Sequence, residues 1–245
     1  MNLSYLAFDI KRLARNRRVL IFSILMPVVL FLVFGLNLKG QTMDQSGMSA
    51  IAYVMISMAM FGSMSAAMSS GGAIAAEREG GWNRTLRLTP LKPQTYILSK
   101  VMLSLALAIP PLVIVFLTGL IGGGVRMSAG DWILVALCSW LGALPFAGLG
   151  LIIGYVAKPD SVQPITGLVT MLIAAFGGLW LPVDQMPHLM KTIAQLTPAY
   201  WTGLTARSPL TNTGFDSHAL WVVLGWTVVL GAIALRRFRA DTARA

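Results

Sequence analysis

The chain has 245 residues, of which 56% are hydrophobic and only 11% are charged, and its mean hydropathy is +0.72. Soluble domains usually carry roughly 25% charged residues, so this composition excludes an ordinary water-soluble domain and favours lipid as the solvent of the chain. The formal net charge of +10 would favour a nucleic-acid partner in a soluble protein, but the distribution of the charges along the chain, given below, excludes that interpretation.

Residues 2–18 are predicted to form an amphipathic helix on the membrane surface. Apolar residues recur at helical spacing on one face, and basic residues fill much of the opposite face. Such a helix buries its apolar side at the headgroup boundary of the bilayer. A disordered basic leader is the alternative. The apolar positions are Leu3, Leu6, Ala7, Ile10, Leu13 and Ala14, and the basic positions are Lys11, Arg12, Arg15 and Arg18.

Six stretches without Asp, Glu, Lys, Arg or His follow, and each is long enough to cross a bilayer, whose apolar core of about 30 Å needs roughly 20 helical residues. We therefore predict an all-α integral membrane protein with six transmembrane helices, in one transmembrane domain covering residues 1–245. A cleaved signal peptide is the alternative for the first stretch, but no small-residue cleavage site follows Leu38. The predicted spans are about 19–38, 51–75, 98–121, 132–156, 162–182 and 219–236.

The positions of the basic residues predict the orientation of these spans. Of the 19 Lys and Arg residues, 15 lie before the first span, in the second-to-third or fourth-to-fifth connection, or after the last span. The other 4 are Lys39, Arg126, Lys191 and Arg207, which lie in the alternate connections. Because cytoplasmic loops carry the excess of Lys and Arg, we expect a multi-pass protein of the plasma (inner) membrane with both termini in the cytoplasm. The charges then serve as topology determinants and contacts to anionic lipids, and we expect no nucleic-acid partner.

Small residues and methionines recur every four residues in the second predicted span, and a G-x-x-x-G pattern lies in the fourth. Small residues let helix backbones approach closely, either within one subunit or between two subunits. Methionine adapts to varied apolar shapes, so the methionine stripe is a candidate substrate pathway, with ordinary helix packing or lipid contact as the alternative. The candidate packing or dimer residues are Ala59, Ser63, Ala67, Gly71, Gly150 and Gly154, and the candidate pathway residues are Met60, Met64 and Met68.

The connection from Asp184 to His218 is the longest one on the predicted outer side. Within it, apolar residues follow a helical period over a run that is too short to cross the membrane. We expect an interfacial or re-entrant helix in the outer leaflet, before the last span. The apolar positions are Met186, Leu189, Met190, Ile193 and Leu196, and Pro198 ends the run.

The chain carries no recognisable catalytic or metal-binding motif. It has no H-E-x-x-H, no G-x-S-x-G and no G-x-x-x-x-G-K-[ST] pattern. No ionisable residue lies in the middle of a predicted span, where ion-coupled carriers usually need carboxylates or histidines. The lone Cys138 is expected to behave as a small hydrophobic residue. We therefore expect no catalytic residues, no metal and no energy source in this chain, so that a partner must supply the work if the protein pumps.

The connection between the second and third spans combines charges of both signs with apolar residues. Residues 77–91 read E-R-E-G-G-W-N-R-T-L-R-L-T-P-L. Gly80 and Gly81 permit a bend, and Pro90 ends a helix before the third span. We predict a short helix over about 78–90 that lies across the cytoplasmic surface and offers an apolar ridge to a groove on another protein. A solvated loop with topology-determining charges is the alternative.

Two segments resemble bacterial ABC exporter permeases of the drug-resistance type. The run Glu77-Arg78-Glu79, followed by Gly81 and Thr89-Pro90, is similar to the E-R-E-x-G…T-P segment of that family. The stretch from Leu181 to Trp201 is similar to the family pattern before the last span. The resemblance covers the whole chain and implies that residues 78–90 form a coupling helix, which touches a separate ATP-hydrolysing subunit. The implied coupling residues are Glu77, Arg78, Glu79, Trp82, Arg84 and Leu86.

The resemblance further implies the permease subunit of an ATP-driven exporter. Two permease subunits, identical or different, would work with two ATPase subunits. The chain itself would then be no enzyme and hold no cofactor, because ATP and Mg²⁺ would bind to the ATPase partner. The expected cargo is an apolar or amphipathic compound, such as a drug, a natural product or a lipid, which leaves the cytoplasm or the inner leaflet. The alternatives are a scaffold or sensor subunit that transports nothing, and an ion-coupled carrier.

Overall fold

The computed structural model describes residues 17–42, 47–81, 93–211 and 214–244. These residues form a bundle of helices, and their only β-type pairing is one isolated bridge between Thr42 and Ser49. The predicted surface helix over 2–18 lies outside the described residues except for its last two positions, as does most of the predicted coupling helix. The main helices are α2 (Arg17–Leu30), α3 (Ala50–Glu79), α5 (Pro93–Ile121), α6 (Ala129–Leu141), α7 (Leu144–Val156), α8 (Pro159–Phe176), α9 (His188–Gln195), α10 (Pro198–Arg207) and α11 (Ser217–Arg244).

Helices occupy all the apolar stretches that the sequence marks out. Within the described residues, 4 helical segments are long and apolar enough to cross a membrane: Ala50–Glu79, Thr95–Ile121, Ala129–Val156 and Ser217–Asp241. A shorter apolar helix covers Ser23–Leu38, where α2 continues through a π-helical turn and a 3-10 turn. This arrangement agrees with an all-helical membrane protein.

Two of the predicted spans differ from the observed helices in a way that local chemistry explains. The segment predicted at 132–156 is divided into α6 and α7, since Gly142 follows α6 and Pro145 in the first turn of α7 has no backbone N–H to donate. The segment predicted at 162–182 is helical only as far as Phe176, where α8 ends. Gly177 follows this end, and Gly178 has a φ of +78°, a conformation that favours glycine and turns the chain away.

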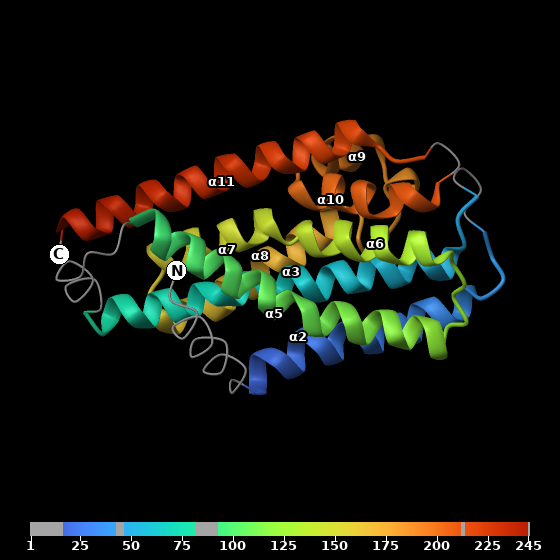
Figure 1. The fold of residues 1–245 in the computed structure, drawn as a ribbon, viewed down its shortest axis with the longest axis horizontal. Helices are drawn as coiled ribbons and strands as arrows, with labels where there is room; N and C mark the ends of the chain where they lie inside the picture. The colour runs from blue at the N-terminus through green and yellow to red at the C-terminus, as the bar shows by residue number, and fades with distance from the viewer. Residues whose placement is uncertain (1–16, 43–46, 82–92, 212–213, 245) are drawn as a thin grey trace.

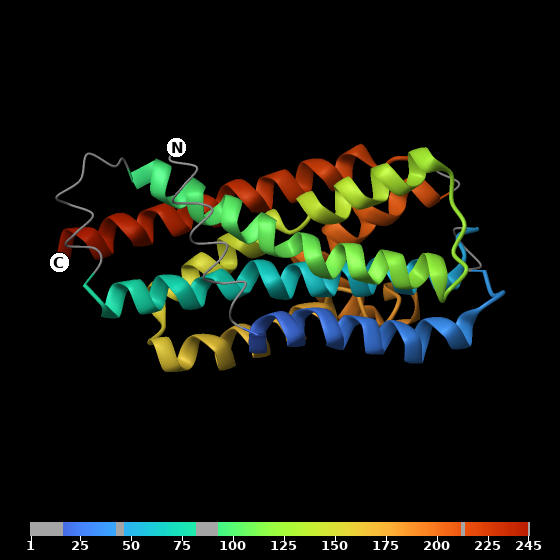
Figure 2. The same ribbon diagram turned by 60° about the horizontal axis from the view of Figure 1, so that its bottom comes forward.

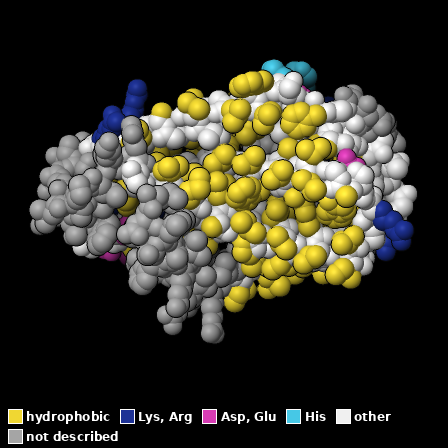
Figure 3. All heavy atoms as spheres, viewed as in Figure 1, with side chains coloured by type: hydrophobic (Ala, Val, Ile, Leu, Met, Phe, Trp, Pro, Cys, Tyr) yellow, Lys and Arg dark blue, Asp and Glu magenta, His cyan; other side chains and the backbone are white. Residues whose placement is uncertain are grey.

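Helix α3 runs along the middle of the bundle in both ribbon views (Figures 1 and 2). In its most apolar window, 89% of the residues are buried by the rest of the chain, compared with 22% for α11. Helices α2, α5, α7 and α8 pack around it. Hydrophobic side chains cover the middle of the face in Figure 3, and Lys and Arg side chains appear toward its two ends, as expected for a protein surrounded by lipid.

The two ends of the bundle are named here after residues that α3 and α10 bring to them. The Arg207 end holds the start of α3 and the C-terminal end of α10, and the Glu77 end holds the end of α3, the start of α5 and the end of α11 (Figure 1). Gly81 and Pro93, the described residues on either side of the segment 82–92, therefore lie at the Glu77 end.

The segment between α8 and α11 contains one helix at the position of the predicted amphipathic run and a second helix that the sequence did not predict. Helix α9 covers most of the expected amphipathic run, and it leaves Leu189 72% exposed, with Leu196 just beyond it 69% exposed. Pro198 ends that run as expected but also begins α10, where the side chain of Thr197 accepts a hydrogen bond from the backbone N–H of Tyr200. Helix α10 packs against α11, α6 and α3.

Candidate functional site

A polar and aromatic cluster joins four helices at the Glu77 end. It ties together the last turns of α3, the first turns of α5, the end of α7 and the last turns of α11. We call it the Glu77 cluster. Its members are Glu77, Arg78, Tyr96, Lys100, Tyr155, Phe238 and Asp241.

Glu77 forms the buried half of the cluster with two residues of α5. Its Oε1 accepts a 2.6 Å hydrogen bond from the Lys100 ammonium, and its Oε2 accepts one of 2.5 Å from the Tyr96 hydroxyl. The Lys100 side chain is fully buried and that of Glu77 is 9% exposed. A charge removed from water is tolerated when it is paired and hydrogen-bonded, and here both oxygens of the carboxylate are satisfied. The ion pair therefore joins the last turn of α3 to the second turn of α5, the helices that precede and follow the segment 82–92 in the sequence.

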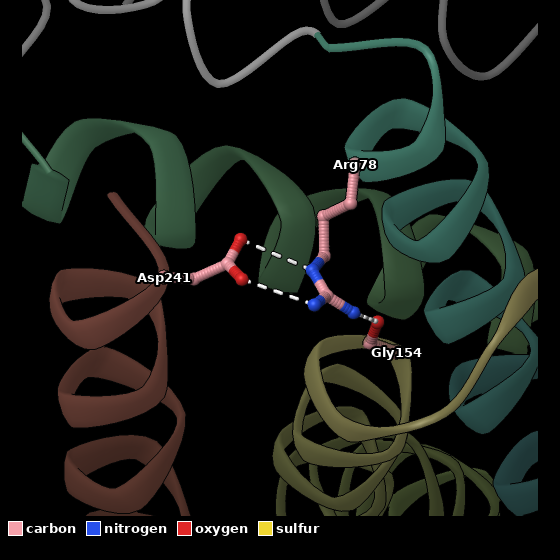
Figure 4. Close-up of polar contacts among 3 residues, drawn as sticks. All are labelled: Arg78, Gly154 and Asp241. Atoms are coloured by element: carbon pink, nitrogen blue, oxygen red, sulfur yellow. Dashed lines mark hydrogen bonds and ion pairs between the residues drawn. The ribbon is translucent and has the colours of Figure 1, made fainter. Parts of the chain in front are cut away.

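Arg78 forms the second half of the cluster and contacts α11 and α7 (Figure 4). Its Nε and Nη2 donate to the two carboxylate oxygens of Asp241, each over 3.0 Å, in the paired geometry that suits a guanidinium and a carboxylate. Its Nη1 donates to the carbonyl oxygen of Gly154 over 3.2 Å. This carbonyl lies in the last turn of α7 and has no intrahelical donor. Arg78 therefore holds the ends of three helices together.

Aromatic rings pack on the apolar side of the same cluster. The ring of Phe238 stacks on that of Tyr96 at 5.2 Å and meets that of Tyr155 edge to face at 6.0 Å. Phe238 and Asp241 are three residues apart and so lie on one face of α11. This face of α11 contacts α5 and α7 through the rings and α3 through Asp241.

The predicted coupling residues divide into three groups in the structure. Glu77 and Arg78 direct their charged groups into the bundle. Glu79 is exposed, with no hydrogen bond or ion pair to any residue that the structure describes. The other three, Trp82, Arg84 and Leu86, lie outside the described residues.

The predicted small-residue ladder faces other helices of the same chain. Gly71 of α3 and Gly150 and Gly154 of α7 meet so closely that a Cβ on Gly71 would overlap the carbonyl oxygen of Gly150. Ser63 donates a 3.0 Å hydrogen bond to the carbonyl oxygen of Ala108 in α5. The remaining ladder residues, Ala59 and Ala67, are fully buried.

The predicted methionine stripe is enclosed by the chain. Met60, Met64 and Met68 are 4%, 1% and 0% exposed. The sulfur of Met68 accepts a 3.3 Å hydrogen bond from the hydroxyl of Thr170 in α8. In this conformation the three side chains contribute to the packing of α3 against its neighbours.

Sequence reasoning missed the partners of Glu77 and Arg78. The sequence marks Lys100 only as a topology-determining charge, and Asp241 lies in a tail dominated by arginines. One signal was present in the sequence. Tyr96 and Lys100 are four residues apart, so they share a face of α5 and can reach one partner together.

Comparison with known proteins assigns the chain to a class. The family model described as "ABC-2 type transporter" matches residues 3–209. The chain is also 31% identical over 196 residues to the Bacillus subtilis (strain 168) protein named "Putative transport permease YvfS". The aligned residues cover 80% of this chain and 79% of that protein.

Proposed function

The chain belongs to the ABC-2 type transporter family, and on this basis we propose that it is the membrane subunit of an exporter driven by a separate ATPase. Family membership supports a multi-pass membrane permease. The observation that supports the coupling proposal is the Glu77 cluster, because it joins α3 and α5, the helices on either side of the segment 82–92, to each other and to α7 and α11. A push on that segment would therefore be passed to α3, α5, α7 and α11 together.

We propose that six spans cross the membrane, with the Glu77 end in the cytoplasm. The four long apolar helices support this, with the helices over Ser23–Leu38 and Pro159–Phe176 as the shorter first and fifth spans. The excess of Lys and Arg in the segments at the Glu77 end favours this orientation. Residues 2–18 would lie on the inner membrane surface, and α9 in the outer leaflet with its exposed apolar side toward lipid.

Residues 78–90 would form the helix that docks on the ATPase. Glu79 would contact the partner directly, because its carboxylate is exposed and free of contacts to the described residues. Trp82, Arg84 and Leu86 would complete the docking surface. Glu77 and Arg78 would not contact the ATPase themselves but would hold the docking helix to the bundle.

The working complex would contain two permease subunits and two ATPase subunits, with ATP and Mg²⁺ held by the ATPases. The cargo would be an apolar or amphipathic compound, since the interior of the bundle offers few charges. Met60, Met64 and Met68 would line the pathway only if α3 separates from its neighbours during the cycle, because they are buried here.

Reconstitution tests this function. The chain is co-purified with a candidate ABC ATPase from the same cell and placed in liposomes that contain a fluorescent phospholipid analogue or a fluorescent amphipathic dye. ATP-dependent movement of either probe that stops when the ATPase is inactivated supports an exporter. A stable complex that hydrolyses ATP but moves neither these two probes nor other apolar and amphipathic probes supports a scaffold role. Movement of a probe driven by an ion gradient alone supports a carrier.

A further inference from the structure

Arg207, the last residue of α10, buries its charged group against α3. The residue is 7% exposed. Its Nη1 donates a 3.0 Å hydrogen bond to the hydroxyl of Ser57, and its Cζ lies 4.4 Å from the centre of the Tyr53 ring. The hydroxyl of Tyr53 in turn donates a 2.8 Å hydrogen bond to the carbonyl oxygen of Gly178, in the turn after α8. One guanidinium thus connects α10 to α3 beside the turn that follows α8.

The neighbouring turn of α10 leaves room for this group. A Cβ on Gly203 would lie 2.7 Å from Nη2 of Arg207 and 3.2 Å from its Cζ. Any larger residue at position 203 would displace the guanidinium. The absence of a side chain at this position is therefore part of the site.

Arg207 differs from Lys100, also a buried cation among the described residues, in the groups that contact it. Lys100 is paired with the carboxylate of Glu77. Among the residues that the structure describes, Arg207 has no carboxylate within ion-pair distance. A guanidinium cannot lose its proton in a protein, so the charge stays, and a hydroxyl and a ring face take the place of water around it. Water can take the place of these two neutral partners when α10 moves, so this contact costs less to open than an ion pair with a carboxylate would.

We propose that Arg207 is a positioning residue that holds α10 closed on α3 in this conformation, and that the transport cycle opens this contact. The proposal rests on the proposed function for its second half. Helix α3 carries Tyr53 and Ser57 near one end and Glu77 and Arg78 near the other. A shift of α3 imposed at the Glu77 end would move the two groups that hold Arg207.

Thiol labelling tests whether Arg207 holds α10. Cys138, the only cysteine of the chain, is replaced by Ser, and Thr205→Cys places a thiol on α10 at a position that is 3% exposed. The protein is labelled in lipid nanodiscs with a polar maleimide that reaches both faces. Arg207→Ala should raise the labelling rate by about tenfold, because a buried thiol reacts only when its segment opens. Arg207→Lys, which keeps the charge over Tyr53, should give a smaller increase.

Two further cysteines serve as controls in the same Cys138→Ser background. Gln195→Cys, at an exposed position of α9 away from its apolar side, should be labelled quickly in every variant. Ser70→Cys, at a fully buried position in the other half of α3, should stay unlabelled. Slow labelling at position 70 in the Arg207→Ala protein excludes general unfolding as the cause of a faster rate at position 205.

The ATP dependence tests the second half of the proposal. In a complex with the ATPase, ATP should speed labelling of Thr205→Cys when Arg207 is present and change it little in the Arg207→Ala protein, which is already open. An unchanged labelling rate in the Arg207→Ala protein would overturn the positioning role. If ATP does not change the labelling rate of Thr205→Cys in a complex that hydrolyses ATP, the opening step is overturned. If no ATPase complex forms, the proposed function fails, while labelling without ATPase still decides whether Arg207 holds α10.

Discussion

Glu77 and Lys100 are 23 positions apart in the sequence, yet the Lys100 ammonium donates a 2.6 Å hydrogen bond to the Glu77 carboxylate. Glu77 lies in the last turn of α3 and Lys100 in the second turn of α5, so the pair bridges the two helices from which the segment 82–92 extends. A carboxylate at the C-terminal end of a helix is disfavoured by the helix dipole. The nearby ammonium offsets this cost, so the placement of Glu77 depends on Lys100.

We predict that the two charges of this pair depend on each other. Lys100→Met should lower the free energy of unfolding by about 3–5 kcal/mol, because it leaves a buried carboxylate without its cation. Glu77→Gln should have a similar cost. The double variant Glu77→Gln/Lys100→Met removes both charges and should recover most of the stability. Thermal unfolding in detergent measures this, and a double variant that is as unstable as either single variant would contradict the pairing.

A second prediction concerns the contact between Arg78 and Asp241. Asp241→Asn should cost about 1 kcal/mol, because both side chains keep some exposure and water screens the pair. Arg78→Ala should cost more, since it also removes the hydrogen bond to the Gly154 carbonyl. Arg237→Ala, at an exposed position on the same helix, is the matched control and should leave stability unchanged.

Salt provides an independent check of the same contact. Raising the ionic strength should narrow the stability difference between the native protein and the Asp241→Asn protein, because salt screens partly exposed charges. A difference that does not respond to salt would indicate that Asp241 acts through packing.

The contact of α3 with α7 gives a third prediction. Gly71→Ala should destabilise the protein by about 1–3 kcal/mol, because the new methyl group overlaps backbone atoms that cannot turn aside. Gly167→Ala in α8 is the control, since no atom lies within 4 Å of a Cβ built there. It should be neutral or stabilising by up to about 1 kcal/mol, the difference in helix propensity. Equal effects of the two substitutions would show that the close approach of α3 and α7 does not limit packing.

The sequence predicts the helices well where apolar length alone determines them. The apolar stretches that lead to α3, α5 and α11 are long enough for a bilayer, and the structure has long helices there. Helix α10 was not predicted from the sequence. It begins at a proline and carries polar residues that are typical of an outer loop, namely Thr202, Thr205 and Arg207. Burial against α3, α6 and α11 stabilises it, and such tertiary contacts leave no periodic signal in the chain.

The candidate site could be predicted only in part for a related reason. The Glu77-Arg78-Glu79 run identified the place along the chain, but a run of charges does not tell which side chains turn inward. That depends on Lys100 and Asp241, which reach the site from α5 and α11 and are distant in sequence. The docking role of Glu79, Trp82, Arg84 and Leu86, the six-span topology and the orientation stay predictions.

The central claim is that the Glu77 end couples this permease to an ATPase. The exposed Glu79 would contact the ATPase, and the Glu77 cluster would transmit the movement to the bundle. ATP hydrolysis by the assembled complex in lipid nanodiscs tests it most directly, with Glu79→Ala compared against Lys191→Ala, a substitution at the opposite end of the molecule. We predict that Glu79→Ala lowers the permease-dependent part of ATP hydrolysis severalfold, by analogy with the loss of one interface charge pair. Its thermal stability should not change, and Lys191→Ala should leave hydrolysis at the native rate. ATP hydrolysis at the native rate in the Glu79→Ala complex, with the ATPase bound at full occupancy, would contradict the claim.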